Sequence, residues 1–104
     1  MFYELRRYRI AEGKMDDWVR FMEEVIIPFQ VAQGMVIAGS FRGEDDTTYV
    51  WLRRFASEEE RERLYAKVYQ TDRWRNEIGP RVAEFMLPDI EVTRIVPTPH
   101  SVIS

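Results

Sequence analysis

The spacing of apolar residues changes from strand-like to helical within the first third of the chain. Phe2 to Ile10 mixes aromatic, branched and charged side chains without a breaker, which predicts a strand that ends at the turn Ala11-Glu12-Gly13. Gly34 predicts the end of the following helix, because glycine accepts the left-handed conformation that often follows helices. Between these points the apolar residues recur at helical spacing and predict an amphipathic helix; they are Met15, Trp18, Phe21, Met22, Val25, Ile26 and Phe29.

The middle of the chain predicts a hairpin followed by a second helix. Met35 to Phe41 and Thr47 to Phe55 are rich in residues that favour strands, and the polar, turn-like residues 42–46 lie between them. Ser57 with Glu60 three residues later forms the capping-box pattern, in which side chain and backbone satisfy each other's free groups where a helix begins.

The last third predicts one more helical segment and a closing strand. Asp72 is expected to cap a helical stretch that is interrupted at Gly79-Pro80 and resumes afterwards, before a strand from Leu87 to Val96. The order is β-α-β-β-α-β with an extra helical segment, which predicts an α+β fold, a ferredoxin-like sandwich with an antiparallel sheet. We expect a single domain over residues 1–97 and a C-terminal tail over 98–104.

Charge and composition narrow the classes of partner. The formal charge is −3 and both signs are interspersed along 104 residues, so no basic stripe is present for nucleic acid to bind. The N-terminus carries charge too early for a secretory segment, and no apolar run is long enough to span a membrane. Cysteine is absent, which fits a reducing compartment, and we expect a cytoplasmic protein.

Both faces of the predicted sheet carry large apolar side chains. In the strand from Thr47 to Phe55, Trp51 and Phe55 point one way, whereas Val50 and Leu52 point the other way. The helices of a ferredoxin-like sandwich cover only one face of the sheet. A homodimer is therefore expected to cover the other face; the alternative is that the extra helical segment or the C-terminal tail wraps it.

The first strand contains the most suggestive group of polar residues. Glu4, Arg6 and Tyr8 share one face with Ile10 by the period of two, and this face is expected to point toward the first helix. Buried charges need partners, so Glu4 and Arg6 are expected to pair with each other, with water or with a ligand, and Arg53 can join them. The alternative is that these residues form structural ion pairs at the dimer seam.

Pro28 lies inside the predicted first helix, where it removes one backbone hydrogen bond and bends the helix. The bend predicts a pocket mouth between Met22, Ile26 and the sheet; alternatively, the proline only sets the angle at which the chain leaves the helix. Tyr49 and Trp51 are aromatic residues that would line such a pocket, although aromatic residues more often fill a core. The candidate ligand-binding residues are Glu4, Arg6, Tyr8, Met22, Tyr49, Trp51 and Arg53.

No catalytic signature is present. The single histidine, His100, lies among prolines in the tail, and the five glycines are scattered singly, so neither a catalytic triad nor a phosphate-binding loop is indicated. We expect no metal site and no cofactor, and no catalytic residue is assigned.

Four segments resemble the NIPSNAP family, within the dimeric α+β barrel superfamily. They are Tyr3-Glu4-Leu5-Arg6-Arg7-Tyr8, Val50 to Ser57 followed by Arg61, Thr71-Asp72-Arg73-Trp74, and Ile95-Val96-Pro97-Thr98-Pro99. Two positions differ from the family pattern as we expect it: Trp51 replaces a histidine and Arg53 a tryptophan. The resemblance implies a barrel of two back-to-back sheets, with a cavity in each subunit between sheet and helices, and it implies no particular reaction.

Three functions remain open at this point. The leading hypothesis is a homodimeric module that binds a small, largely apolar molecule with a polar end. The first alternative is a cofactor-free monooxygenase or isomerase, in which Tyr8 or Glu4 moves a proton and Arg6 stabilises a developing anion. The second alternative is a protein-interaction module with no enclosed pocket.

Overall fold

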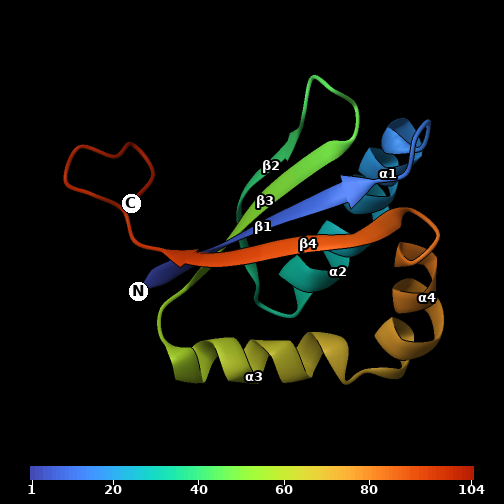
Figure 1. Cartoon of the computed structure of the whole chain (residues 1–104). Helices are drawn as coiled ribbons and strands as arrows, with labels where there is room; N and C mark the ends of the chain where they lie inside the picture. Colours follow the sequence, from blue (N-terminus) through green and yellow to red (C-terminus); the bar gives the residue numbers. More distant parts are fainter.

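A computed structural model describes residues 1–104 as one antiparallel sheet and a set of helices (Figure 1). The strands are β1 (Phe2–Ile10), β2 (Val36–Arg42), β3 (Thr48–Phe55) and β4 (Met86–Ile95), in the order β2-β3-β1-β4. The helices are α1 (Met15–Phe21), α2 (Ile27–Ala32), α3 (Glu58–Tyr69) and α4 (Gly79–Val82), with π-helical segments η1 (Met22–Ile26) and η2 (Trp74–Ile78). The predicted α+β, ferredoxin-like fold is confirmed.

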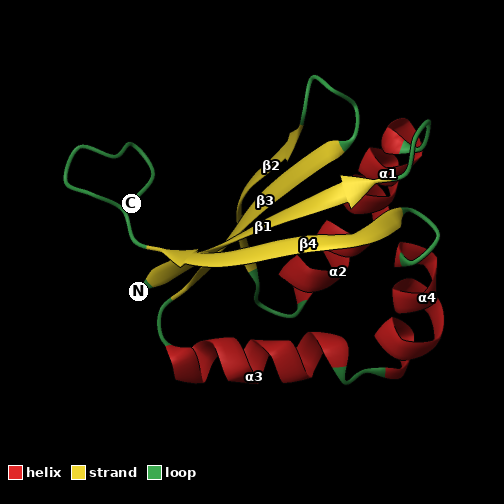
Figure 2. Cartoon of the chain, in the orientation of Figure 1, coloured by secondary structure: helices red, strands yellow, loops and turns green.

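The helices pack on one face of the sheet (Figure 2). Side chains alternate along β3, so every second residue points toward the helices and is buried, as predicted for this strand. Trp18 from α1 and Met22 from η1 join one apolar cluster, and Leu64 and Val68 from α3 join another. The inward residues of β3 are Tyr49, Trp51, Arg53 and Phe55.

Both π-helical segments end just before a proline. The amide of Ile27 donates to the carbonyl of Met22, and the amide of Gly79 donates to that of Trp74, so each turn is one residue wider than an α-turn. Pro28 and Pro80 lie at the start of the α-helices that follow. A proline ring collides with the carbonyl four residues earlier in a regular α-helix, and the wide turn relieves this collision. The first helix therefore continues through Pro28 with a local widening.

The predicted helix ends are partly confirmed. Ser57 Oγ accepts a hydrogen bond from the amide of Glu60 at 3.1 Å, as the capping-box pattern predicts. Gly34 adopts φ +108° after α2, the left-handed conformation expected there. The prediction that Asp72 caps the next helical stretch is wrong, because Thr71 Oγ1 accepts from the amide of Trp74 at 3.1 Å. The predicted interruption at Gly79-Pro80 is also wrong, since the chain passes directly from η2 into α4.

The opposite face of the sheet carries apolar side chains with no helix over them, as the sequence predicted. Leu5, Val50 and Leu52 are half-buried, whereas Val36 and Phe41 are exposed. The ring of Phe41 lies across Gly39, where a Cβ would come within 2.6 Å of it. We call Leu5, Val36, Phe41, Val50 and Leu52 the outer apolar strip.

The C-terminal tail covers one corner of this face. Tyr3 Oη donates a hydrogen bond to the carbonyl of Ser104 at 3.0 Å, and a groove forms between Leu52, Ile95 and Ile103. Most of the outer apolar strip lies outside this groove, so the tail does not replace a second cover. None of the helices combines the length and the apolar character that crossing a membrane requires.

Candidate functional site

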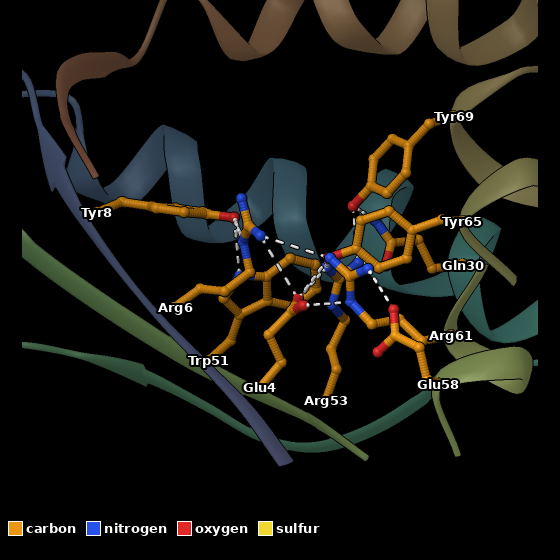
Figure 3. Close-up of polar contacts among 10 residues, drawn as sticks. All are labelled: Glu4, Arg6, Tyr8, Gln30, Trp51, Arg53, Glu58, Arg61, Tyr65 and Tyr69. Atoms are coloured by element: carbon orange, nitrogen blue, oxygen red, sulfur yellow. Dashed lines mark hydrogen bonds and ion pairs between the residues drawn. The ribbon is translucent and has the colours of Figure 1, made fainter. Parts of the chain in front are cut away.

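A carboxylate and a guanidinium group meet in the interior between β1, β3 and α3 (Figure 3). Glu4 is 1% exposed and Arg53 is 0% exposed. Arg53 Nη2 donates to Glu4 Oε1 at 2.6 Å, and Tyr65 Oη donates to the same oxygen at 2.6 Å. Glu4 and Arg53 are cross-strand neighbours in the register of β1 and β3, and both point toward the helices. The prediction that Arg53 joins the polar face of the first strand is confirmed.

Arg53 is surrounded by acceptors and aromatic faces that replace its hydration. Its Nη1 donates to Gln30 Oε1 at 2.9 Å and to Tyr69 Oη at 2.7 Å, while Nη2 also donates to Tyr65 Oη at 2.6 Å. The guanidinium lies 4.8 Å from the ring centroid of Trp51. Only Nε remains without a partner. A buried charge is tolerated because paired groups compensate for its desolvation.

Glu4 accepts hydrogen bonds from three arginines. Arg61 Nε donates to its second oxygen at 3.0 Å, and Arg6 Nη1 reaches the first oxygen at the longer distance of 3.4 Å. Burial by itself raises the pKa of a carboxyl group, but the Tyr65 hydrogen bond and the charge of Arg53 outweigh it and lower the pKa of Glu4 to about 2. Glu4 is therefore ionised at neutral pH and a weak base.

This lowered pKa predicts a specific loss of stability in acid. Because the folded-state pKa of about 2 lies below the ordinary 4.5, the stabilisation is present above pH 4.5 and is lost as the pH falls toward 2. We expect the free energy of unfolding to drop by on the order of 2–3 kcal/mol from this group alone. Urea unfolding of wild type and Glu4→Gln between pH 6 and pH 2 measures it: the difference in unfolding free energy between the two proteins should narrow by this amount in acid. A gap that stays constant with pH would contradict the assignment.

Arg6 forms a second polar group with two aromatic residues. Arg6 Nε donates to Tyr8 Oη at 2.7 Å, and Trp51 Nε1 donates to the same oxygen at 3.0 Å. Burial raises the pKa of the Tyr8 hydroxyl above its usual range, although the nearby charge of Arg6 opposes the shift. Tyr8 therefore keeps its proton at physiological pH.

A cavity of about 210 Å³ lies beside this second group, between the sheet and the helices. Eleven residues line it and ten of them are hydrophobic, including all three tryptophans of the chain. They come from β1, β3 and β4 on one side and from every helical part except α2 on the other. The lining consists of Arg6, Tyr8, Trp18, Met22, Trp51, Tyr65, Tyr69, Trp74, Val82, Met86 and Ile90.

The predicted candidate residues divide between the cavity and the buried ion pair. Arg6, Tyr8, Met22 and Trp51 line the cavity. Glu4, Tyr49 and Arg53 are buried on the same face of the sheet but do not line it. The remaining lining residues were not among the candidates, and α3, η2, α4 and β4 supply most of them; only their aromatic or aliphatic character signalled that they would be buried.

The wide helical turns contribute directly to the cavity wall. Met22 is the first residue of η1, Trp74 is the first residue of η2, and both line the cavity. Gly79 leaves room for the Trp74 indole, since a Cβ there would lie 3.2 Å from Trp74 Nε1. Wide turns of this kind often occur at functional sites. Of the pocket mouth predicted between Met22, Ile26 and the sheet, Met22 lines the cavity but Ile26 is buried in the core and does not, and the widening lies at residues 22–26.

Comparison with known proteins identifies the family. The NIPSNAP family model matches residues 3–102, nearly the whole chain. The chain belongs to the NIPSNAP family. The resemblance that the four sequence segments indicated is thus confirmed. No functionally curated protein matches this NIPSNAP sequence.

Solved structures similar to this NIPSNAP protein carry the same fold. A NIPSNAP family protein with unknown function from Agrobacterium tumefaciens is 24% identical, with 100% of this chain and 94% of that chain covered and a TM-score of 0.89. A second NIPSNAP family protein from Agrobacterium tumefaciens is 25% identical, with 99% and 98% covered and a TM-score of 0.85. An antibiotic biosynthesis monooxygenase is 12% identical, with 95% and 100% covered and a TM-score of 0.67, which shows the fold alone.

The fold does not bring together a set of side chains that could bind a metal ion. No three side chains of His, Cys, Asp or Glu lie close enough together to hold a metal ion. The polar groups at the cavity are a guanidinium, phenol hydroxyls and indole N–H groups. The arrangement is suited to binding and orienting a small molecule by hydrogen bonds and aromatic contacts.

Proposed function

We propose that this NIPSNAP protein is a homodimeric module that binds a small, largely apolar molecule with one polar end. The observation that carries the proposal is the cavity of about 210 Å³, with ten hydrophobic residues and Arg6 in its wall. Ligand pockets in proteins have this composition, an apolar lining with few polar groups that fix orientation. A module that acted only through its surface would not need such a cavity.

The size of the cavity limits the ligand. An apolar cavity of roughly 150 Å³ accommodates a benzene ring. The cavity of about 210 Å³ therefore has room for one ring with a short substituent. Half-exposed Ile90 on β4 marks the side from which such a molecule enters.

Binding is favoured over the cofactor-free oxygenase or isomerase by the state of Glu4. Both of its oxygens are occupied by Arg53, Tyr65 and Arg61, its pKa is lowered to about 2, and it does not line the cavity. A general base needs a pKa near the working pH and reach to the substrate. Glu4 has neither property, and its contacts support a structural role.

The homodimer is supported by the outer apolar strip. Val36 and Phe41 are exposed on a sheet face that carries no helix, and the tail covers only the corner near Tyr3. Charged residues of both signs flank the strip: Arg7 on β1 forms an ion pair with Glu91 on β4 at 3.1 Å. An apolar centre with a mixed charged rim is typical of a surface that packs against a second copy.

Binding of a neutral aromatic molecule tests the cavity. We expect toluene to shift the indole N–H resonances of all three tryptophans in a saturable way, with a dissociation constant on the order of 1 mM or below. Val82→Trp should abolish the effect because the larger side chain fills the cavity from α4.

The control is Val31→Trp, which adds the same side chain at an exposed position on α2, away from the lining. This variant should bind toluene as wild type does. If Val82→Trp, folded by circular dichroism, bound toluene unchanged, or if wild type bound neither toluene nor a polar benzene derivative, the proposed function would be rejected.

A further inference from the structure

The hydroxyl of Tyr8 has a hydrogen with no acceptor inside the protein. Its oxygen accepts from Arg6 Nε at 2.7 Å and from Trp51 Nε1 at 3.0 Å. Neither of these N–H groups can accept a hydrogen bond in return. The Tyr8 hydroxyl therefore remains available as a donor, and Tyr8 lines the cavity.

Tyr69 repeats this arrangement on the opposite wall. Its oxygen accepts from Arg53 Nη1 at 2.7 Å and from Gln30 Nε2 at 3.4 Å, and its own hydrogen is donated to no protein group. Tyr69 also lines the cavity. Tyr65 differs, because its hydroxyl donates to Glu4. Two of the three tyrosines in the lining thus present spare donors.

Two further donors in the lining lack strong partners. Trp18 Nε1 is buried and makes no hydrogen bond, although the residue lines the cavity. Arg6 uses Nε for Tyr8, its Nη1 makes only contacts of 3.4 and 3.5 Å to Glu4 and Tyr65, and its Nη2 makes none. The Nη end of this guanidinium is therefore free to engage a ligand. An unpartnered buried donor costs free energy, which an acceptor in the cavity would recover.

The cavity lining contains no carboxylate to balance these donors. None of its eleven lining residues is an aspartate or a glutamate. The one carboxylate nearby, Glu4, does not reach the cavity, and it faces the three guanidinium groups of Arg6, Arg53 and Arg61. This group of charges is positive overall and mostly shielded from water, so it favours a negative charge in its neighbourhood.

We propose that the cavity binds a monocarboxylate with a single-ring apolar body, whose carboxylate is held by the Nη end of Arg6 and the hydroxyl of Tyr8. The ring then lies among Trp74, Val82 and Met86. A carboxylate matches the planar fork of one guanidinium, and it supplies only acceptors, which is what the spare donors require. This inference rests on the proposed function, since it names the ligand class of the same cavity.

The test compares benzoate and phenylacetate with their neutral amides, benzamide and phenylacetamide, by calorimetric titration of the full-length protein. We expect each carboxylate to bind at least tenfold more tightly than its amide, because the amide keeps the shape but loses the charge. Arg6→Gln should reduce carboxylate affinity at least tenfold and leave amide affinity within a factor of two. Tyr8→Phe should reduce carboxylate affinity severalfold and provides a second variant with intact packing.

Arg20→Gln is the matched control, because Arg20 is a largely exposed arginine on α1 that neither lines the cavity nor contacts Glu4. It should leave carboxylate binding within a factor of two, with folding of every variant checked by circular dichroism. Amides that bind as tightly as the carboxylates, or equal losses for both ligands in Arg6→Gln, would overturn the inference while the proposed function stands. Absence of binding by carboxylates, amides and toluene alike would overturn both.

Discussion

Replacing Glu4 by glutamine is expected to lower the free energy of unfolding by about 3–5 kcal/mol at pH 7, the usual cost of breaking a buried ion pair from one side. The amide keeps the shape of the carboxylate but leaves the guanidinium of Arg53, which is fully buried, without a counter-charge. Arg6 and Arg61 would also lose the single anion that they share. Urea unfolding followed by tryptophan fluorescence measures the change.

The control for this substitution is Glu58→Gln. Glu58 also pairs with arginines, Arg94 at 2.6 Å and Arg61 at 3.5 Å, but the side chains of Glu58 and Arg94 are about half exposed to solvent. Exposed ion pairs contribute about 0–1 kcal/mol, so Glu58→Gln should have a small effect. Equal losses in the two variants would mean that burial of Glu4 does not determine its contribution.

The variant Phe41→Asp is expected to dissociate the proposed homodimer, with a dissociation constant raised roughly 100-fold or more. Phe41 is 53% exposed and belongs to the outer apolar strip, so the substitution changes little inside the subunit. In a dimer packed through this strip, a carboxylate would be buried against apolar side chains without a partner. Sedimentation equilibrium across a range of protein concentrations measures the effect.

Val31→Asp is the matched control for the dimer. Val31 is 51% exposed but lies on α2, in the helical layer on the other face of the sheet. This variant should sediment as wild type does. A wild-type protein that remains monomeric when concentrated would contradict the homodimer. If Phe41→Asp dimerised with the same affinity as wild type, the interface would lie elsewhere on the subunit.

The fold was predictable because its signals are local. The helical spacing from Met15 to Phe29, the alternation along β3 and the cap at Ser57 each depend on neighbours within a few residues. The helix that Asp72 was expected to cap shows the limit of such signals. Thr71 and Asp72 are both good capping residues, so residue type alone does not decide between them, and the structure uses Thr71.

Sequence reasoning could predict only the part of the candidate site that lies on a single strand and its paired neighbour. Glu4, Arg6 and Tyr8 share a face by strand geometry, and the pairing of Arg53 with Glu4 follows from the β1–β3 register. Tyr65, Tyr69 and Trp74 join them only through the packing of α3 and η2, which sequence spacing does not specify. The prolines were the sole indication that the helices widen at these positions.

The two π-helical segments make the composition of the cavity wall depend on the number of residues in these helical turns as well as on the identity of their side chains. Each holds one residue more than an α-turn over the same span. Removing a single residue from 22–26 would restore regular winding and leave the later helical positions in their present orientation, because the wide turn alone takes up the extra residue. Such a deletion would change which side chain this turn presents to the cavity, where Met22 now lies, without moving the rest of the helix. Insertions and deletions in these helices are thus a route by which recognition diversifies on an unchanged sheet.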